Sequence, residues 1–173
     1  TKVTAVPTSD AYQAEIQQPH GERFPADGKY AAENRPFGGR LNFIINEGDT
    51  ASMDTVTVEI FNAEGEQIRT LKTKAENGVN KLIWNLDRKS TAESSSGRGR
   101  RGNSRGFYEP SGGDALPGQY RIVYNYKDEK AETTINVYGD PRIEANIADL
   151  RAKEAFTKKL EALSTKVSAS TKK

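Results

Sequence analysis

Apolar and polar residues alternate along several short segments between Thr55 and Tyr138. The clearest are residues 56–61, 82–86 and 120–126, where every second residue is Val, Ile, Leu, Trp or Tyr. Because successive side chains on a strand point to opposite faces, this period of two predicts half-buried β-strands. Each strand then has an apolar face that another sheet must cover, so the pattern predicts a two-layer β-sandwich.

Turn residues separate the predicted strands. Gly65 ends the segment Asn62-Ala63-Glu64-Gly65 and can take the positive φ that closes a hairpin between residues 55–61 and 67–71. In the returning strand, Ile68 and Leu71 are the expected apolar positions. The same combination of alternation and turn residues predicts further strands at residues 40–46, 79–86, 119–126 and 131–137.

The period changes beyond residue 141. Apolar residues then recur at the spacing of one helical face, at Phe156, Leu160, Leu163 and Val167. Asn146 suits the N-cap of this helix, and Asp149 and Lys166 suit its dipole. Because the stripe is too short for a stable coiled coil, we expect it to pack on the sandwich or on a domain upstream of the chain.

Composition divides the 173 residues into three parts. Residues 1–35 are polar and lack a sustained period, which predicts an extended lead-in. Residues 36–140 hold the sandwich, with a flexible Gly/Arg/Ser-rich loop at 88–113, and residues 141–173 hold the helix and a frayed tail. The low mean hydropathy of −0.79 agrees with a chain that is partly tail or loop.

Charge and residue usage argue against several kinds of partner and site. The formal net charge of +2 is too small to indicate nucleic acid, and we do not expect that partner. The absence of Cys and the single His exclude a disulfide framework and a multi-histidine metal site. No apolar stretch is long enough for a membrane span. Since the chain begins at Thr1 without a signal peptide, we expect it to be part of a longer polypeptide with an upstream targeting signal.

The loop at 88–113 has the most unusual local composition in the chain. It gathers arginines among Gly and Ser with no acid, followed by an aromatic, and the candidate binding residues are Arg98, Arg100, Arg101, Arg105 and Tyr108. Segments of this composition bind RNA by neutralising phosphates and stacking on bases. We favour a solvated loop, because the aromatics are confined to Phe107 and Tyr108, and a protein partner for the loop stays open.

The aromatic residues of the strands have two interpretations. If these side chains are exposed, Trp84 would suit a glycan, and Tyr120, Tyr124 and Tyr126 would suit a glycan or a protein partner. If they are buried, they belong to the core. We favour the buried interpretation because of their positions in the alternation. The predicted core is Val58, Ile60, Leu82, Trp84, Leu86, Ile122, Tyr124, Ile135 and Val137.

The ionisable residues do not suggest a reaction. Five aspartates lie in or beside predicted turns but lack the dense spacing of a calcium loop: Asp49, Asp54, Asp114, Asp128 and Asp140. His20 has no Ser or Cys context that would make it part of a triad. We therefore predict no catalytic, cofactor-binding or metal-binding residue, and no cofactor. A third hypothesis for the function, that the chain is a fragment of an enzyme, is therefore disfavoured.

Three segments carry a resemblance to a known family. Residues 56–71, 78–86 and 116–120, with Trp84 in the second, resemble the C-terminal Ig-like domain of sortilin-like (VPS10/BNR-repeat) glycosyl-hydrolase-type bacterial proteins. They are similar also to the Ig-like domain of the flagellar hook-capping family. The resemblance covers most of residues 20–165 and includes the Gly/Arg-rich insertion.

The resemblance implies an all-β Ig-like or fibronectin-type antiparallel sandwich of about seven strands with an appended C-terminal helix. It also implies an exported polypeptide in which an upstream β-propeller binds or hydrolyses the substrate. No catalytic residue is carried over. The function expected of this chain is a non-catalytic accessory domain that packs against or spaces that propeller. The alternative is a glycan- or protein-binding module.

Overall fold

The computed structural model describes residues 1–14, 36–47, 54–90, 106–108, 110–144 and 146–171. Within these ranges the chain forms strands and one helix, in the order β1 (Val3–Ala5), β2 (Ala11–Tyr12), β3 (Gly39–Ile45), β4 (Thr55–Phe61), β5 (Gln67–Lys74), β6 (Gly78–Trp84), β7 (Asp87–Lys89), β8 (Gly106–Tyr108), β9 (Ser111–Asp114), β10 (Gly118–Tyr126), β11 (Glu129–Tyr138) and α1 (Ile147–Thr171).

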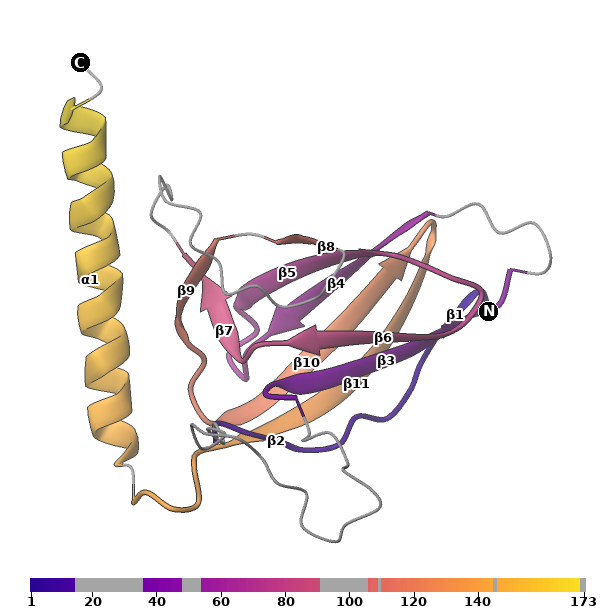
Figure 1. Ribbon diagram of the computed structural model, residues 1–173, viewed down its shortest axis with the longest axis horizontal. Helices are drawn as coiled ribbons and strands as arrows, with labels where there is room; N and C mark the ends of the chain where they lie inside the picture. Colours follow the sequence, from indigo (N-terminus) through magenta and orange to yellow (C-terminus); the bar gives the residue numbers. More distant parts are fainter. Residues whose placement is uncertain (15–35, 48–53, 91–105, 109, 145, 172–173) are drawn as a thin grey trace, which may run out of the picture.

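The strands form two facing sheets and a small third one (Figure 1). One sheet has the order β1-β3-β6, and the other has the order β2-β11-β10-β4-β5-β8. The third sheet pairs β7 with β9 at the end of the molecule where α1 lies. The fold is therefore a mostly β, sandwich-like arrangement with one C-terminal helix.

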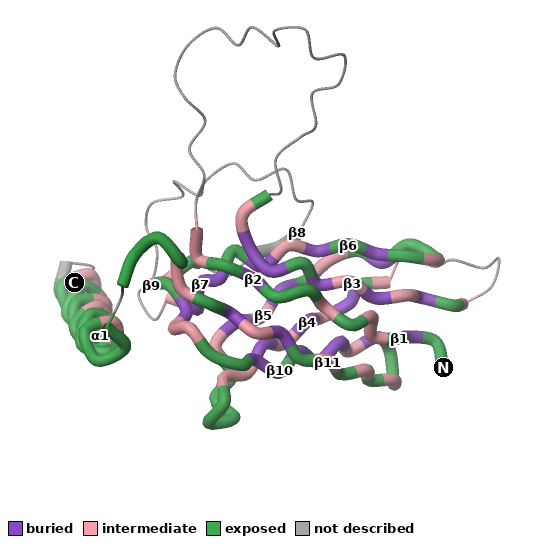
Figure 2. The backbone as a smooth tube through the Cα atoms, turned by 90° about the horizontal axis from the view of Figure 1, so that it is seen from below, coloured by how far each residue is buried: buried purple, intermediate pink, exposed green. Residues whose placement is uncertain are grey.

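The core lies between the two larger sheets, and Figure 2 shows buried positions along their strands. The nine core residues predicted from the alternation are all buried. Tyr120, Tyr124 and Tyr126 are buried as well, so the prediction that these tyrosines face inward is confirmed. Burial raises the pKa of Tyr120 to about 12 and that of Tyr124 further, because a phenolate between the sheets would lose its water.

The lead-in differs from its prediction. Val3 pairs with Ile45 at one edge of the smaller sheet, and Ala11 pairs in parallel with Val137 at the edge of the larger one. Both Val3 and Ala11 are buried in the core. The sandwich thus begins at Val3 rather than at residue 36. The sequence did not reveal these strands because segments of three and two residues are too short to display a period.

The inner face of β5 also differs from its prediction. Leu71 is buried as expected, but its inward neighbour on the strand is Arg69, while Ile68 is only partly buried. Ile68 and Leu71 are three residues apart and cannot share one face of a regular strand. The register between β4 and β5 shifts at Ile60 and Phe61, and beyond that shift Arg69 occupies an inward position.

The predicted loop at 88–113 contains secondary structure at both ends, namely β7, β8 and β9. Residues 91–105 and 109 lie outside the described residues. The preceding strand β6 ends at Trp84 rather than at Leu86, since Leu86 has a left-handed φ of 55° that a strand cannot accommodate. Within this bend the indole Nε1–H of Trp84 donates to the carbonyl oxygen of Asp87, at 2.8 Å.

Gly38 is a position where only glycine fits. Its φ is 116°, and a Cβ there would lie 2.4 Å from the carbonyl oxygen of Trp84. We expect Gly38→Ala to lower the free energy of unfolding by about 1–3 kcal/mol, measured by urea denaturation. Gly118→Ala is the matched control, because a Cβ at Gly118 meets nothing within 4 Å. Equal stability of the two variants would contradict this interpretation.

Within the described residues, α1 lacks the apolar character that a membrane-spanning helix would require.

Candidate functional site

The helix α1 is the feature that departs most from a simple sandwich. It begins at Ile147, and the backbone N–H of Ala148 donates to Asn146 Oδ1 at 2.9 Å, which confirms Asn146 as the N-cap. The helix lies beside β9 at one end of the molecule, outside the two facing sheets (Figure 1). Its two long faces therefore have different surroundings.

The face of α1 that is turned toward the sandwich is largely polar. The least exposed described residues of the helix recur at helical spacing, at Leu150, Glu154, Thr157, Glu161, Thr165 and Ser168. Thr157 lies against β9, since its Cγ2 would be 3.5 Å from a Cβ placed at Gly113. Small side chains and carboxylates, rather than an apolar stripe, thus join the helix to the sandwich.

An ion pair between Arg88 on β7 and Glu161 on α1 forms the centre of this junction. The guanidinium of Arg88 donates two hydrogen bonds to the carboxylate, Nη1 to Oε2 at 3.0 Å and Nη2 to Oε1 at 2.9 Å. The two side chains are only 7% and 12% exposed. A bidentate pair of this kind is among the stronger polar contacts in proteins, and it sets the position of α1 against β7.

A second ion pair continues the junction into the larger sheet. Arg69 on β5 approaches Asp87 with Nη2 at 3.4 Å from Oδ2, and its Nη1 donates to the carbonyl oxygen of Pro110 at 2.9 Å. We call Arg69, Asp87, Arg88 and Glu161 the junction cluster. Its charges form two pairs, which lead from β5 through β7 to α1, and each pair offsets part of the cost of burying its two charges.

The other face of α1 carries the apolar stripe, which we define as Phe156, Leu160, Leu163 and Val167. These side chains are between 49% and 63% exposed. Each residue turns an α-helix by about 100°, so the stripe and the sandwich-facing residues lie about 120° apart around the axis. The expectation that the stripe packs on the sandwich is therefore wrong. Its packing on a different domain stays a prediction.

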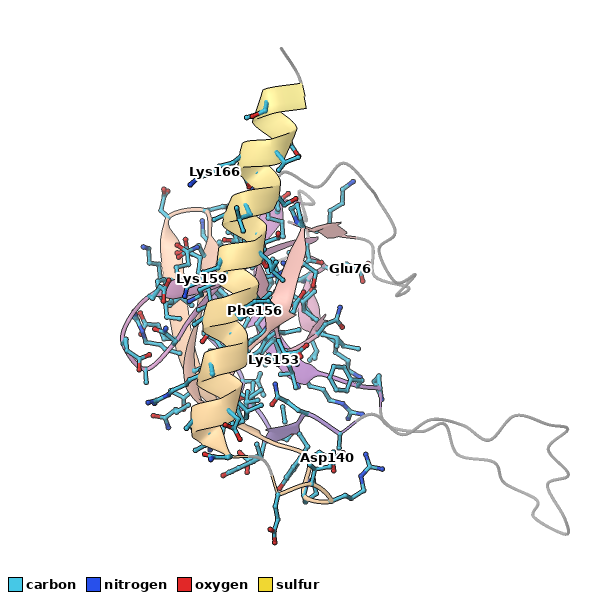
Figure 3. All side chains as sticks on the ribbon, turned by 90° about the vertical axis from the view of Figure 1, so that its left-hand side faces the viewer. Glu76, Asp140, Lys153, Phe156, Lys159 and Lys166 are labelled. Atoms are coloured by element: carbon cyan, nitrogen blue, oxygen red, sulfur yellow. The ribbon has the colours of Figure 1, made fainter. Side chains whose placement is uncertain are left out.

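Lysines border the apolar stripe. Figure 3 looks onto α1 from the side away from the sandwich, with Lys153, Phe156, Lys159 and Lys166 labelled along the helix. Lys153 Nζ lies 3.3 Å from the exposed carboxylate of Asp114 on β9. Two acids of the helix are on its other side, since Glu161 binds Arg88 and Glu154 binds Lys158 at 3.0 Å. The outward face is thus apolar along its centre and basic at its margins.

A second polar cluster lies where β3 and the β10–β11 turn meet. The carboxylate of Glu47 accepts hydrogen bonds from Lys127 Nζ and from the hydroxyl of Tyr126. Lys127 Nζ also lies 3.2 Å from Asp54. These contacts lower the pKa of Glu47, with the bond from Lys127 the main cause, and the carboxylate in turn raises the pKa of Tyr126.

Glu47 makes stability depend on pH. Because its pKa is lower in the folded chain than its ordinary value of 4.5, its contribution is complete above about that pH and is lost as the pH falls through the lowered pKa. We expect the thermal midpoints of the wild type and Glu47→Gln to differ at neutral pH and to approach each other as the pH falls below 4.5, the ordinary pKa of the group. A difference that persists unchanged at pH 2 would contradict this role.

The site residues predicted from sequence fall mainly outside the described residues, as Arg98, Arg100, Arg101 and Arg105 do. The backbone of Tyr108 lies on β8, where it pairs with Leu71 of β5. The structure thus brings Tyr108 to the edge of the larger sheet, and the prediction of a binding loop remains a prediction. His20 and Asp49 also lie outside the described residues.

Three of the predicted turn aspartates form ion pairs: Asp54 with Lys127, Asp114 with Lys153 and Asp140 with Arg142. The hydrogen bonds from Arg142 lower the pKa of Asp140 to about 2. In the described ranges, His, Cys, Asp and Glu side chains nowhere gather in threes as the ligands of a metal ion would. Each of these three carboxylates thus lies beside a basic residue.

An exposed aromatic pair lies at the β2–β11 edge of the larger sheet. Tyr12 and Tyr138 are direct partners in the parallel pairing, and their rings stack with centroids 5.3 Å apart. Their side chains are 46% and 45% exposed. Nearby on the same sheet, Asn136 Nδ2 donates to Asp10 Oδ1 at 3.1 Å. An aromatic surface beside amide and carboxylate groups therefore exists, at tyrosines that the sequence did not single out.

Sequence reasoning also missed the junction cluster. Arg69 lies two residues before Leu71 and therefore on the same inward face of β5, and a charged residue at that position was the available signal for a buried partner. Nothing in the sequence indicated that the partner would be Asp87 or that Arg88 would reach a helix residue 73 positions further along the chain.

These features define the class of the protein as a mostly β, sandwich-like domain with a C-terminal helix that is attached by its polar face. No family model matches the chain, and a search of curated proteins and one of solved structures likewise found no match.

Proposed function

We propose that this chain is a non-catalytic structural module of a larger polypeptide and that it packs against a neighbouring domain through α1. The observation that carries the proposal is the orientation of the helix. Four apolar side chains face solvent, while the polar face is held on the sandwich by a buried ion pair. Exposing such a stripe is unfavourable unless another surface covers it.

The arrangement of strands supports the Ig-like or fibronectin-type part of the proposal. With β2 and β7–β9 set aside, β1-β3-β6 face β11-β10-β4-β5, and the chain crosses between the sheets after β3, β5 and β6. Sandwiches of this class share two antiparallel sheets joined by such crossings. Folds of this kind host many functions, so the function rests on the helix face and not on the fold.

The resemblance in sequence suggests which neighbour to expect. It implies an exported bacterial polypeptide with an upstream β-propeller, and both the export and the propeller belong to the proposal. The sandwich, whose core is continuous between its sheets, would act as a rigid support for that neighbour.

The test compares the complete polypeptide with a version from which this chain is deleted. Calorimetry should show that the neighbouring domain unfolds at a lower temperature without the chain, because each kcal/mol of coupling shifts a midpoint by roughly 2–4 °C. An unchanged midpoint would contradict packing. Hydrolysis of an aryl glycoside by this chain alone would contradict the non-catalytic part of the proposal.

The Tyr12–Tyr138 pair favours glycan binding as a second candidate function. Sugar rings stack on exposed aromatic faces, and the adjacent Asn136 and Asp10 carry groups that bind hydroxyls. A glycan array with the wild type and Tyr138→Ala tests this candidate. Signals that Tyr138→Ala removes and that the control Phe156→Ala retains would support it, whereas equal signals from both variants would exclude this surface.

A further inference from the structure

We infer that the outward face of α1 docks into an apolar groove rimmed by carboxylates, and that this groove belongs to the neighbouring domain of the same polypeptide. The inference rests on the proposed function and adds to it the residues of the contact and the chemistry of the partner. It is carried by the juxtaposition of the apolar stripe with Lys153, Lys159 and Lys166 on a helix that is already attached to the sandwich by another face.

The spacing of the stripe indicates how it docks. Phe156, Leu160, Leu163 and Val167 follow the i, i+4, i+7, i+11 pattern by which a helix places anchors in a groove. They occupy an arc of about 60° around the axis, which is narrower than the ~100° of a helix that lies on a broad apolar surface. The small residues Ala152 and Ser164 border this arc, so that a groove wall can approach the helix closely.

The narrow arc argues against a lipid surface as the occupant. A helix that lies in a membrane interface buries a wide apolar face. Here Lys153 and Lys159 flank the stripe closely on its two sides. A groove with a polar rim accommodates that arrangement better than a continuous apolar layer does.

Charge identifies the rim. Lys159 and Lys166 lie on one side of the stripe, whereas Lys153 on the other side is paired with Asp114, and Glu154 and Glu161 form ion pairs away from the stripe. The acid of the helix that lies in line with the stripe is Asp149, in the first turn. A complementary partner therefore presents Asp and Glu side chains beside an apolar centre.

The same charges argue against a second copy of this chain. If two α1 helices packed stripe to stripe, Lys159 and Lys166 of one copy would face the same lysines of the other, and like charges at such positions repel. Their acids could not compensate, because Glu161 remains bound to Arg88.

The size of the stripe points to a partner in the same polypeptide. Four half-exposed side chains present on the order of 400 Å², well below the ~800 Å² that each partner buries in a stable interface between separate proteins. A covalent connection removes this difficulty, since it raises the effective concentration of the partner to about the millimolar range. A separate protein would need a larger contact than the stripe provides.

The experiment uses the complete polypeptide and zero-length carbodiimide cross-linking, which joins a lysine amine to a carboxylate that it contacts. Peptide sequencing should find Lys159 and Lys166 joined to Asp or Glu residues of the neighbouring domain. We expect Leu160→Glu to reduce these cross-links at least tenfold, because a carboxylate would enter the apolar centre of the groove. The double variant Lys159→Glu/Lys166→Glu should also lower the thermal midpoint of the neighbouring domain.

The matched controls are Val79→Glu and Lys81→Glu, which make the same changes at exposed positions on β6. They should leave the cross-links and the midpoint unchanged. Since Leu160 is exposed, Leu160→Glu should not unfold this chain, and its circular dichroism checks that point.

Three results would overturn the inference. The first is cross-linking of these lysines to a second copy. The second is Leu160-dependent binding to vesicles of phosphatidylcholine and phosphatidylglycerol. The third is that this chain stabilises the neighbouring domain but Leu160→Glu leaves the thermal midpoint of that domain unchanged. That result would retain the proposed function and show that the outward face of α1 is not the contact. If deleting the whole chain has no effect on the neighbour, the proposed function itself fails.

Discussion

Replacing Trp84 with alanine is expected to lower the free energy of unfolding by about 3–5 kcal/mol. The side chain is completely buried between the sheets, and its ring meets that of Tyr120 edge-on with centroids 5.1 Å apart. Alanine would leave a cavity between the sheets, because the buried residues around the ring can move into that space only in part. Urea denaturation followed by circular dichroism measures the loss.

Trp84→Phe separates the two contributions of the indole. It retains most of the apolar ring but removes the N–H that donates to the carbonyl oxygen of Asp87. We expect it to cost about 1–3 kcal/mol, the usual penalty for a buried acceptor without a partner. A denaturation midpoint that stays the same in Trp84→Ala would show that the ring is not central to the core.

The second large effect is expected for Glu161→Ala. It would leave the guanidinium of Arg88 buried without its carboxylate, and breaking a buried ion pair in this way costs about 3–5 kcal/mol. The helix can relieve this penalty by moving away from β7 so that water reaches Arg88. We therefore expect α1 to detach while the sandwich stays folded, which hydrogen exchange of the helix amides would detect as faster exchange.

Two controls define this prediction. Lys158→Ala removes an exposed pair with Glu154 within the helix and should cost no more than about 0.5 kcal/mol. The double variant Arg88→Leu/Glu161→Leu removes both charges, so it should exchange more slowly than Glu161→Ala. Helix exchange in Glu161→Ala that equals the wild type would show that the pair does not hold α1.

The candidate site could be predicted only in part. The spacing of Phe156, Leu160, Leu163 and Val167 located the stripe, because a helix repeats every 3.6 residues whatever surrounds it. The same spacing does not reveal which surface covers the stripe, and the structure shows that the sandwich does not. Likewise, the alternation identified aromatic strands, but the exposed pair involves Tyr12, whose strand of two residues leaves no period to detect.

The sequence by itself determined which segments become the long strands, that Trp84 and its neighbours form the core, and where the helix begins. These are local consequences of period and capping, since a strand with one apolar face must bury it and an N-cap must satisfy its N–H groups. Only the tertiary structure decided that Arg69 lies inward, that Val3 and Ala11 complete the two sheets, and that Arg88 pairs with Glu161. Contacts between residues far apart in the chain decide the last two outcomes, and the local pattern carries no signal for them. For Arg69 the pattern shows a charged residue on the same face as Leu71, but not the partner beside which it is buried.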